Sequence, residues 1–216
     1  MHDPSETQPH RRSVGILLFD DVEVLDFAGP FEVFSVTGRR DGSYPFDVFT
    51  IAEHVRPIAA RNQLKVIPKH SFESFPKIDV LVIPGGFGTR REMLNQSLLD
   101  WVKEQSARAE LVLSICTGAL ILGRAGLLDG MPATTHHGAI NLLKEVAPAA
   151  QVQANRRVID NGKFVIAAGV SSGIDASFHV VARLLGNDVA QETADYIEYP
   201  LSLSDATTPR SVPAPR

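Results

Sequence analysis

Short apolar runs alternate along this chain with longer segments whose apolar residues recur at helical spacing. Residues 14–19, 80–83 and 111–115 are almost entirely apolar, which is typical of parallel strands buried on both faces. Each run is followed by a segment of helical periodicity. This order predicts an α/β fold, with a mainly parallel sheet covered by helices on both faces.

The remaining elements follow from the same periodicity and from turn residues. Residues 64–68 are expected in a hairpin or an edge strand because Pro68 cannot donate to a central ladder. An antiparallel hairpin is predicted for 157–160 and 163–167, with its turn at Asn161-Gly162. The other predicted strands are 46–51 and 133–135, and the predicted helices are 26–38, 98–109, 117–128, 139–146, 174–185 and 189–199.

The ends of the chain differ in composition from its middle. Residues 1–12 are polar and lack the apolar centre of a signal peptide. Residues 201–216 are rich in proline, serine, threonine and alanine, a composition that cannot bury a core. We therefore predict one domain over 13–200 between two disordered tails, which fits the usual domain size.

Charge and cysteine content exclude several classes of function. The net charge is −4, from 21 basic and 25 acidic residues, so no partnership with nucleic acid or an anionic membrane is expected. No apolar run is long enough to span a bilayer. A single cysteine excludes an internal disulfide framework and a multi-cysteine metal site. A lone thiol suits a reducing compartment, and a cytoplasmic location is expected.

That cysteine, Cys116, lies where a predicted strand gives way to a predicted helix. Residues 114–118 (SICTG) have the small-x-nucleophile-x-Gly form of a nucleophile elbow. At such a turn the side chain is expected to be exposed beside a helix N-terminus, where a thiol ionises more easily. The alternative is a buried structural cysteine, since free cysteines are often buried.

Three turns are expected to meet Cys116 at the carboxyl edge of the sheet, where ligands bind in open α/β folds. Asp26, flanked by apolar residues, is a candidate general acid with a raised pKa; spacing alone favours a helix N-cap. Gly85 and Gly86 can offer backbone N–H groups to a ligand, as in an oxyanion hole, or form an ordinary tight turn. Thr117 follows the nucleophile directly.

Histidines provide further candidates. His136 or His137 can act as a base for the cysteine, but adjacent residues on a strand point to opposite faces and make a poor metal chelate. No further ligand stands at suitable spacing, so no metal site is predicted. His179 is interpreted as a core histidine with its hydrogen bonds satisfied, and Asp175 as a residue that stabilises a helix N-terminus.

Five motifs in register resemble the ThiJ/PfpI superfamily of class I glutamine amidotransferase-like proteins. They are residues 25–30 (LDFAGP), 82–86 (VIPGG), 114–119 (SICTGA), 125–130 (AGLLDG) and 133–136 (ATTH). The chain is most similar to the isocyanide (isonitrile) hydratase branch, and also to the sensor domains of AraC-type transcription activators. The resemblance implies a flavodoxin-like sandwich that forms a homodimer.

The resemblance also implies roles for individual residues. Cys116 is then the nucleophile and Asp26 the acid that hydrogen-bonds it. Thr117 is the third expected catalytic residue, whose region helps Asp26 to position water. It occupies the position at which protease-like members carry histidine, which counts against a peptidase. Gly85, Gly86 and His136 are expected to bind substrate or an oxyanion. Neither a metal nor an organic cofactor is needed.

The sequence departs from that branch at two places. His137 stands where the hydratases have tryptophan, and the loop 87–92 (FGTRRE) is more charged than theirs. Both changes affect the expected pocket, and therefore the substrate.

The resulting hypothesis is hydration of an isocyanide, a small-molecule substrate, to an N-substituted formamide through a thioimidate on Cys116. A second hypothesis keeps Cys116 and Asp26 but acts on a small carbonyl compound, as a hydrolase or glyoxalase-like enzyme. A third is a stand-alone ligand or redox sensor. A direct transcription-factor role is not expected, because no helix-turn-helix region follows residue 200.

Overall fold

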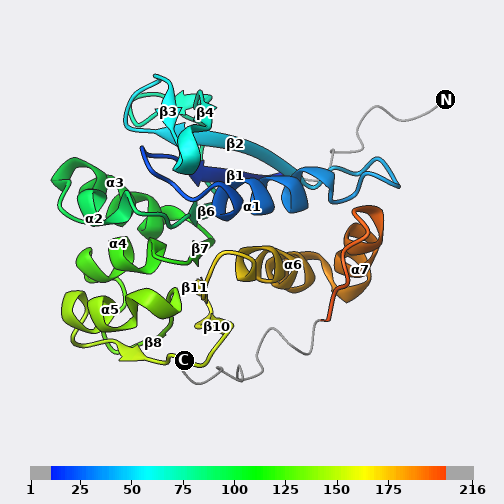
Figure 1. Cartoon of the computed structure of the whole chain (residues 1–216). Helices are drawn as coiled ribbons and strands as arrows, with labels where there is room; N and C mark the ends of the chain where they lie inside the picture. The colour runs from blue at the N-terminus through cyan, green and yellow to red at the C-terminus, as the bar shows by residue number, and fades with distance from the viewer. Residues whose placement is uncertain (1–10, 203–216) are drawn as a thin grey trace.

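A computed structural model describes residues 11–202 and shows a seven-stranded sheet with helices on both faces (Figure 1). The strand order is β10-β11-β7-β6-β1-β2-β5, and every neighbouring pair is parallel except β10 with β11. This confirms the mainly parallel sheet predicted from the alternation of strands and helices, and the flavodoxin-like sandwich implied by the family resemblance. The strands of this sheet are β1 (Arg12–Leu17), β2 (Phe46–Ala52), β5 (His70–Ser71), β6 (Val80–Ile83), β7 (Leu111–Ile115), β10 (Val158–Asp160) and β11 (Phe164–Ala167).

The helices form two layers, which Figure 1 shows on opposite sides of the sheet. One layer holds α1 (Val24–Val36), α6 (Ser172–Leu185) and α7 (Asn187–Tyr196), and the other holds α3 (Gln96–Arg108), α4 (Gly118–Arg124) and α5 (Ile140–Val146). The four-residue α2 (Thr89–Glu92) packs beside α4. Within the first layer, Gly29 allows α1 to approach α6 closely, because an added Cβ would lie 2.9 Å from Ile174 Cγ1.

Smaller elements complete the described chain. The strands β3 (Ile58–Ala59) and β4 (Lys65–Val66) form an antiparallel pair, and β8 (Pro132–Ala133) pairs in parallel with β9 (Gln151–Val152). Two 3₁₀ helices are present, η1 (Arg61–Gln63) and η2 (His137–Ala139).

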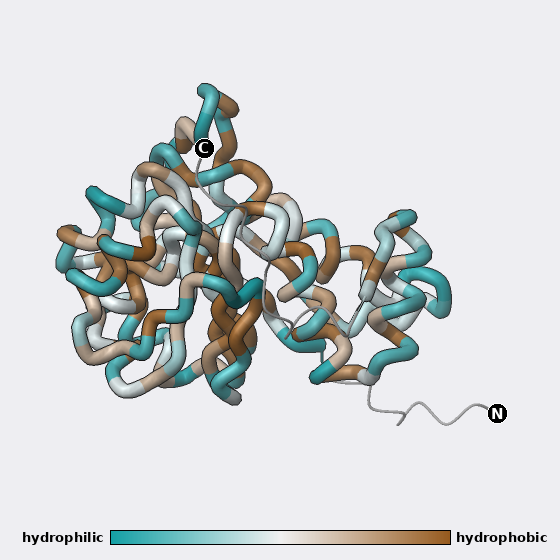
Figure 2. Tube along the Cα trace, turned by 60° about the horizontal axis from the view of Figure 1, so that its bottom comes forward, coloured by the Kyte–Doolittle hydropathy of each residue, from teal (hydrophilic) through white to brown (hydrophobic). Residues whose placement is uncertain are grey.

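The core lies along the central strands. All residues of β6, β7 and β11 are buried, as their apolar sequences require when helices cover both faces. In Figure 2 the most hydrophobic segments gather at the middle of the molecule. The carboxyl ends of these parallel strands share one edge of the sheet and bring their following loops together.

Several predicted elements are confirmed and others need correction. The hairpin at Asn161-Gly162 is confirmed, and 64–68 does contribute to a hairpin through β4. The helix predicted for 117–128 is too long. It ends at Arg124, because Gly126 and Gly130 take positive φ angles of 72° and 74° and turn the chain. The strand predicted for 133–135 is also wrong beyond Ala133, where β8 ends.

The predicted tails lie largely outside the described residues. Of residues 1–12, the structure describes the last two, and β1 already begins at Arg12. Of residues 201–216 it describes Leu201, which packs against the core, and Ser202. No helix within 11–202 is long and apolar enough to cross a membrane.

Candidate active site

Cys116 sits in a strained turn between β7 and α4. Its φ angle is +54°, a left-handed conformation that non-glycine residues rarely adopt. The Thr135 hydroxyl donates a 2.7 Å hydrogen bond to the Cys116 carbonyl and holds this turn in place. Gly118 is required at the start of α4, because an added Cβ would lie 2.2 Å from the Ile83 carbonyl oxygen. These features form the predicted strand-to-helix elbow.

Asp26 faces the cysteine from the first turn of α1. Its side chain is fully buried, and its Oδ2 accepts a 2.9 Å hydrogen bond from the Gly85 N–H. Its Oδ1 is buried and has no hydrogen-bond partner within the described chain. The thiol of Cys116 interacts with this carboxyl group, and we call the two groups the Cys116–Asp26 pair.

The N-cap interpretation of Asp26 is wrong. Helix α1 begins at Val24, two residues before Asp26, and Glu23 occupies the cap position. The carboxyl group bonds across to Gly85, in the loop after β6, rather than to its own helix. Asp26 therefore joins two of the loops that were predicted to meet at the sheet edge.

Burial raises the pKa of both members of the pair. The pKa of Asp26 is raised to about 7, mainly because burial disfavours its carboxylate. The pKa of Cys116 is raised to about 12 by burial, and the neighbouring Asp26 charge contributes. Backbone N–H groups of Val170 and Thr117 at the sulfur act in the opposite direction. Between about pH 7 and 12 the pair therefore carries one proton.

The expectation of an exposed, easily ionised thiol is thus wrong for the resting site. Only 5% of Cys116 is exposed, and the loss of hydration outweighs the favourable backbone dipoles around the sulfur. The thiol becomes a good nucleophile only as its proton moves to another group, and the adjacent group that can accept it is Asp26.

Gly85 and Gly86 lie at the site, but their N–H groups are not free for a ligand. Gly85 donates to Asp26, and Gly86 donates to the Thr117 hydroxyl oxygen at 2.9 Å. That hydroxyl donates in turn to the Gly86 carbonyl, also at 2.9 Å. The two glycines therefore position Asp26 and Thr117. Gly85 must be glycine, because a Cβ there would lie 2.5 Å from the Thr117 nitrogen.

One of the two backbone N–H donors near the sulfur, that of Val170, belongs to a loop for which no role was predicted from the sequence. Val170 follows β11, which runs parallel to β7 and ends at the same edge of the sheet. The rule that identified the other loops applies equally to this one. Because 163–167 was interpreted only as half of a hairpin, the loop after it was missed.

Of the two adjacent histidines, His136 lines the cavity at Cys116, and His137 is exposed. Neither lies on a strand, so the prediction that they point to opposite faces is wrong; their ring centroids are 4.2 Å apart. His136 Nδ1 accepts the Gly138 N–H at 3.1 Å. The neutral ring then carries its proton on Nε2. Within residues 11–202 no three His, Cys, Asp or Glu side chains are grouped to hold a metal.

Two other predicted roles need adjustment. His179 is not in the core: it is half-buried and hydrogen-bonds Asp160 at 2.7 Å. Asp175 lies in the first turn of α6, as its predicted role requires. It is also an ion-pair partner of Arg157 and accepts a 2.6 Å hydrogen bond from the Tyr199 hydroxyl.

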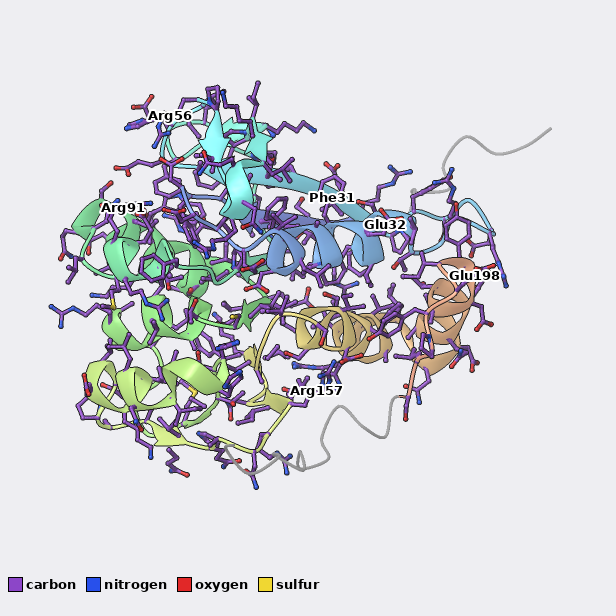
Figure 3. All side chains as sticks on the ribbon, in the orientation of Figure 1. Phe31, Glu32, Arg56, Arg91, Arg157 and Glu198 are labelled. Carbon is purple, nitrogen blue, oxygen red and sulfur yellow. The ribbon has the colours of Figure 1, made fainter. Side chains whose placement is uncertain are left out.

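Two cavities open near this edge of the sheet. The smaller one, of about 170 Å³, contains Cys116. The larger one, of about 440 Å³, lies toward Arg56 and Arg91, whose side chains Figure 3 labels at one end of the molecule. No cysteine, serine or threonine lines the larger cavity, so the smaller cavity, which contains Cys116, is the candidate active site. That cavity is lined by Glu23, Arg61, Gly86, Phe87, Arg90, Cys116, Thr117, His136 and Val170.

Comparisons with known proteins identify relatives of this chain. Isonitrile hydratase from Pseudomonas putida is 34% identical over 203 residues, which cover 93% of this chain and 85% of that protein. The HTH-type transcriptional regulator GbdR from Pseudomonas aeruginosa is 23% identical over 188 residues, and the chain spans about half (51%) of its length.

Solved structures show the same fold. A THiJ/PfpI family protein from Pseudomonas syringae aligns with a TM-score of 0.79 and 27% identity. The alignment covers 94% of this chain and 83% of the chain of that protein. Drosophila melanogaster DJ-1beta matches with a TM-score of 0.75 and 20% identity, covering 88% of this chain and 98% of its own. The DJ-1/PfpI family profile spans residues 12–183. With its sandwich fold and cysteine elbow, the chain belongs to the DJ-1/PfpI family.

Proposed function

We propose that this protein hydrates isocyanides to N-substituted formamides, with Cys116 as nucleophile and Asp26 as proton carrier. The observation that carries the proposal is the buried Cys116–Asp26 pair, which holds one proton above about pH 7 inside a small cavity. The 34% identity of this chain to an isonitrile hydratase, over most of both chains, supports the choice of substrate.

In the first step the sulfur attacks the terminal isocyanide carbon while the pair's single proton is delivered to that carbon from Asp26. A C–S bond and a C–H bond form, and one bond of the C≡N group is lost. The product is a thioimidate on Cys116, with Asp26 left as a carboxylate. Asp26 Oδ1, which has no other partner in the described structure, is suited to this transfer.

In the second step water adds to the imidate carbon. One water proton reaches the imidate nitrogen through Asp26, which leaves a tetrahedral intermediate bearing a hydroxyl group. The C–S bond then breaks, its electron pair returns to the sulfur, and the hydroxyl proton passes to Asp26. The N–H groups of Val170 and Thr117 stabilise the departing thiolate. The formamide is released with the pair again holding one proton.

Steady-state formation of the formamide from p-nitrophenyl isocyanide tests the proposal. Wild type is expected to turn over, and Cys116→Ala to lose activity to the uncatalysed rate, because no thioimidate can form. Thr37→Val is a matched control, since Thr37 is buried but lies at the far end of α1. Formamide production by Cys116→Ala would contradict the mechanism. Turnover of phenylglyoxal instead of the isocyanide would favour the glyoxalase-like alternative.

A sensor role is the second candidate, supported by the regulator relative of which this chain covers half. The site argues against oxidation sensing, because such cysteines are accessible and have a low pKa, whereas burial raises the pKa of Cys116. Ligand sensing without turnover would be shown by a saturable isocyanide complex that releases no formamide.

We also propose a homodimer, which light scattering of the purified protein tests.

A further inference from the structure

The mouth of the Cys116 cavity is formed by one aromatic ring and two arginines. Phe87 is 62% exposed, although it is a large apolar side chain. The guanidinium carbons of Arg90 and Arg61 lie 5.1 and 5.9 Å from the centroid of its ring. All three residues line the cavity that contains Cys116. Two of them, Phe87 and Arg90, belong to the charged loop that departs from the hydratase pattern.

Both arginines are positioned by backbone contacts. The Arg61 N–H donates to the Val22 carbonyl at 2.9 Å, which ties the start of η1 to the loop after β1. The Arg90 N–H donates to the Phe87 carbonyl at 3.3 Å, within the turn that leads into α2. The two side chains therefore reach the mouth from separate loops, and stacking on Phe87 holds them there.

Neither guanidinium forms an ion pair with a carboxylate within the described chain. Arg90 Nη1 makes only a long contact, 3.4 Å, to the Gly86 carbonyl. The neighbouring larger cavity is different, because its two arginines are neutralised: Arg56 pairs with Asp20 and Arg91 with Glu92. Of these two cavities, only the one that contains Cys116 therefore has arginines without a carboxylate partner in the described chain.

Building on the proposed function, we propose that Arg61 and Arg90 bind an anionic group on the substrate, a carboxylate, while its isocyanide carbon reaches Cys116. Guanidinium groups bind carboxylates through charge-assisted hydrogen bonds, and Phe87 offers an apolar surface to the substrate frame. A cavity of about 170 Å³ has room for a small molecule rather than a drug-sized ligand. The substrate class is therefore a small isocyanide that carries a carboxylate.

The competing explanation is charge balance. Glu23 also lines the cavity, and the Cys116–Asp26 pair adds a negative charge above about pH 7, so the two arginines can act by offsetting these charges. In that case removing an arginine would affect charged and neutral substrates alike. Substrate recognition instead predicts a loss confined to the charged substrate, which separates the two explanations.

The test compares 4-isocyanobenzoate with its methyl ester as substrates of wild type, Arg61→Gln and Arg90→Gln. Each variant is expected to lower kcat/KM for the carboxylate by about fivefold to tenfold, mainly through KM, and to leave the ester within about twofold. Arg40→Gln is the control, because Arg40 is exposed in the turn beyond the far end of α1. The preference of wild type for the carboxylate should also weaken as salt is added.

Equal losses for the two substrates, or no preference in wild type, would overturn the proposal. If neither isocyanide is hydrated, the proposed function is refuted. The anion site is then tested by a second measurement that needs no turnover. Calorimetry then compares 4-formamidobenzoate with its methyl ester as ligands. Tighter binding of the carboxylate, lost in Arg61→Gln and Arg90→Gln, would support the anion site independently of turnover; equal binding would refute it.

Discussion

Replacing Asp26 by asparagine should stabilise the protein while abolishing its chemistry. The substitution keeps the shape of the side chain, and the amide oxygen can still accept the Gly85 N–H. It removes a charge that is fully buried above neutral pH. It also removes the proton carrier of the proposed reaction, so turnover is expected to fall to the level of Cys116→Ala.

The size of the stability gain follows from the pKa. Asp26 has a pKa of about 7 in the fold against an ordinary value of 3.8. This difference of roughly 3 pH units corresponds to about 4 kcal/mol. Because the folded pKa is raised, the folded state binds more protons than the unfolded chain between these values. The contribution of Asp26 protonation to the free energy of unfolding is complete below about pH 4 and is lost as the pH rises to about 7.

Urea unfolding at several pH values measures this effect. The single tryptophan, Trp101, is 7% exposed and stacks on Phe72, so its fluorescence should report unfolding. Between about pH 4.5 and 8 the free energy of unfolding of wild type should fall relative to Asp26→Asn by about 3 kcal/mol. Other titrating groups, such as Asp160, are common to both proteins and cancel in the difference. A difference that does not change with pH would refute the assignment of a buried, proton-sharing Asp26.

Four further predictions concern the pH dependence of the reaction and the residues that hold the elbow, with Gly130 as a comparison. Because the reaction needs the one-proton state of the pair, kcat/KM should fall about tenfold per pH unit below about pH 7; a flat profile down to about pH 5 would contradict it. Gly85→Ala should lower kcat/KM by more than about a hundredfold, since the added Cβ would displace Thr117 and Asp26. At Gly130 an added Cβ would have no atom within 4 Å, but the φ angle of 74° disfavours alanine. Gly130→Ala should therefore cost about 1 kcal/mol of stability and retain activity. Thr135→Val leaves the buried Cys116 carbonyl without its 2.7 Å hydrogen bond and should cost about 1–3 kcal/mol in urea unfolding, with reduced kcat.

The fold and the position of Cys116 at an elbow could be predicted from the sequence because they depend on local patterns. Apolar runs such as 80–83 and 111–115 need two covering layers, and a small-x-Cys-x-Gly segment between strand and helix needs an elbow. The convergence of Asp26, Gly85 and Cys116 followed from a topological rule about strand ends. These features require no knowledge of side-chain packing.

The electrostatics of the site could not be predicted in this way. Whether a thiol at a helix N-terminus ionises depends on how deeply it is buried, and burial is set by loops remote in sequence, such as that of Val170. The roles of Gly85 and Gly86 were misjudged for a similar reason. Their N–H groups are used by Asp26 and Thr117, and hydrogen-bond partners 59 and 31 residues away leave no mark on the local pattern.

The most direct test of the account is mass spectrometry of the enzyme during a single turnover of p-nitrophenyl isocyanide. The mechanism predicts a transient adduct that adds the mass of one isocyanide to the peptide containing Cys116, and that decays as the formamide appears. Formamide released by wild type with no adduct, on a time scale that resolves turnover, would contradict covalent catalysis by Cys116.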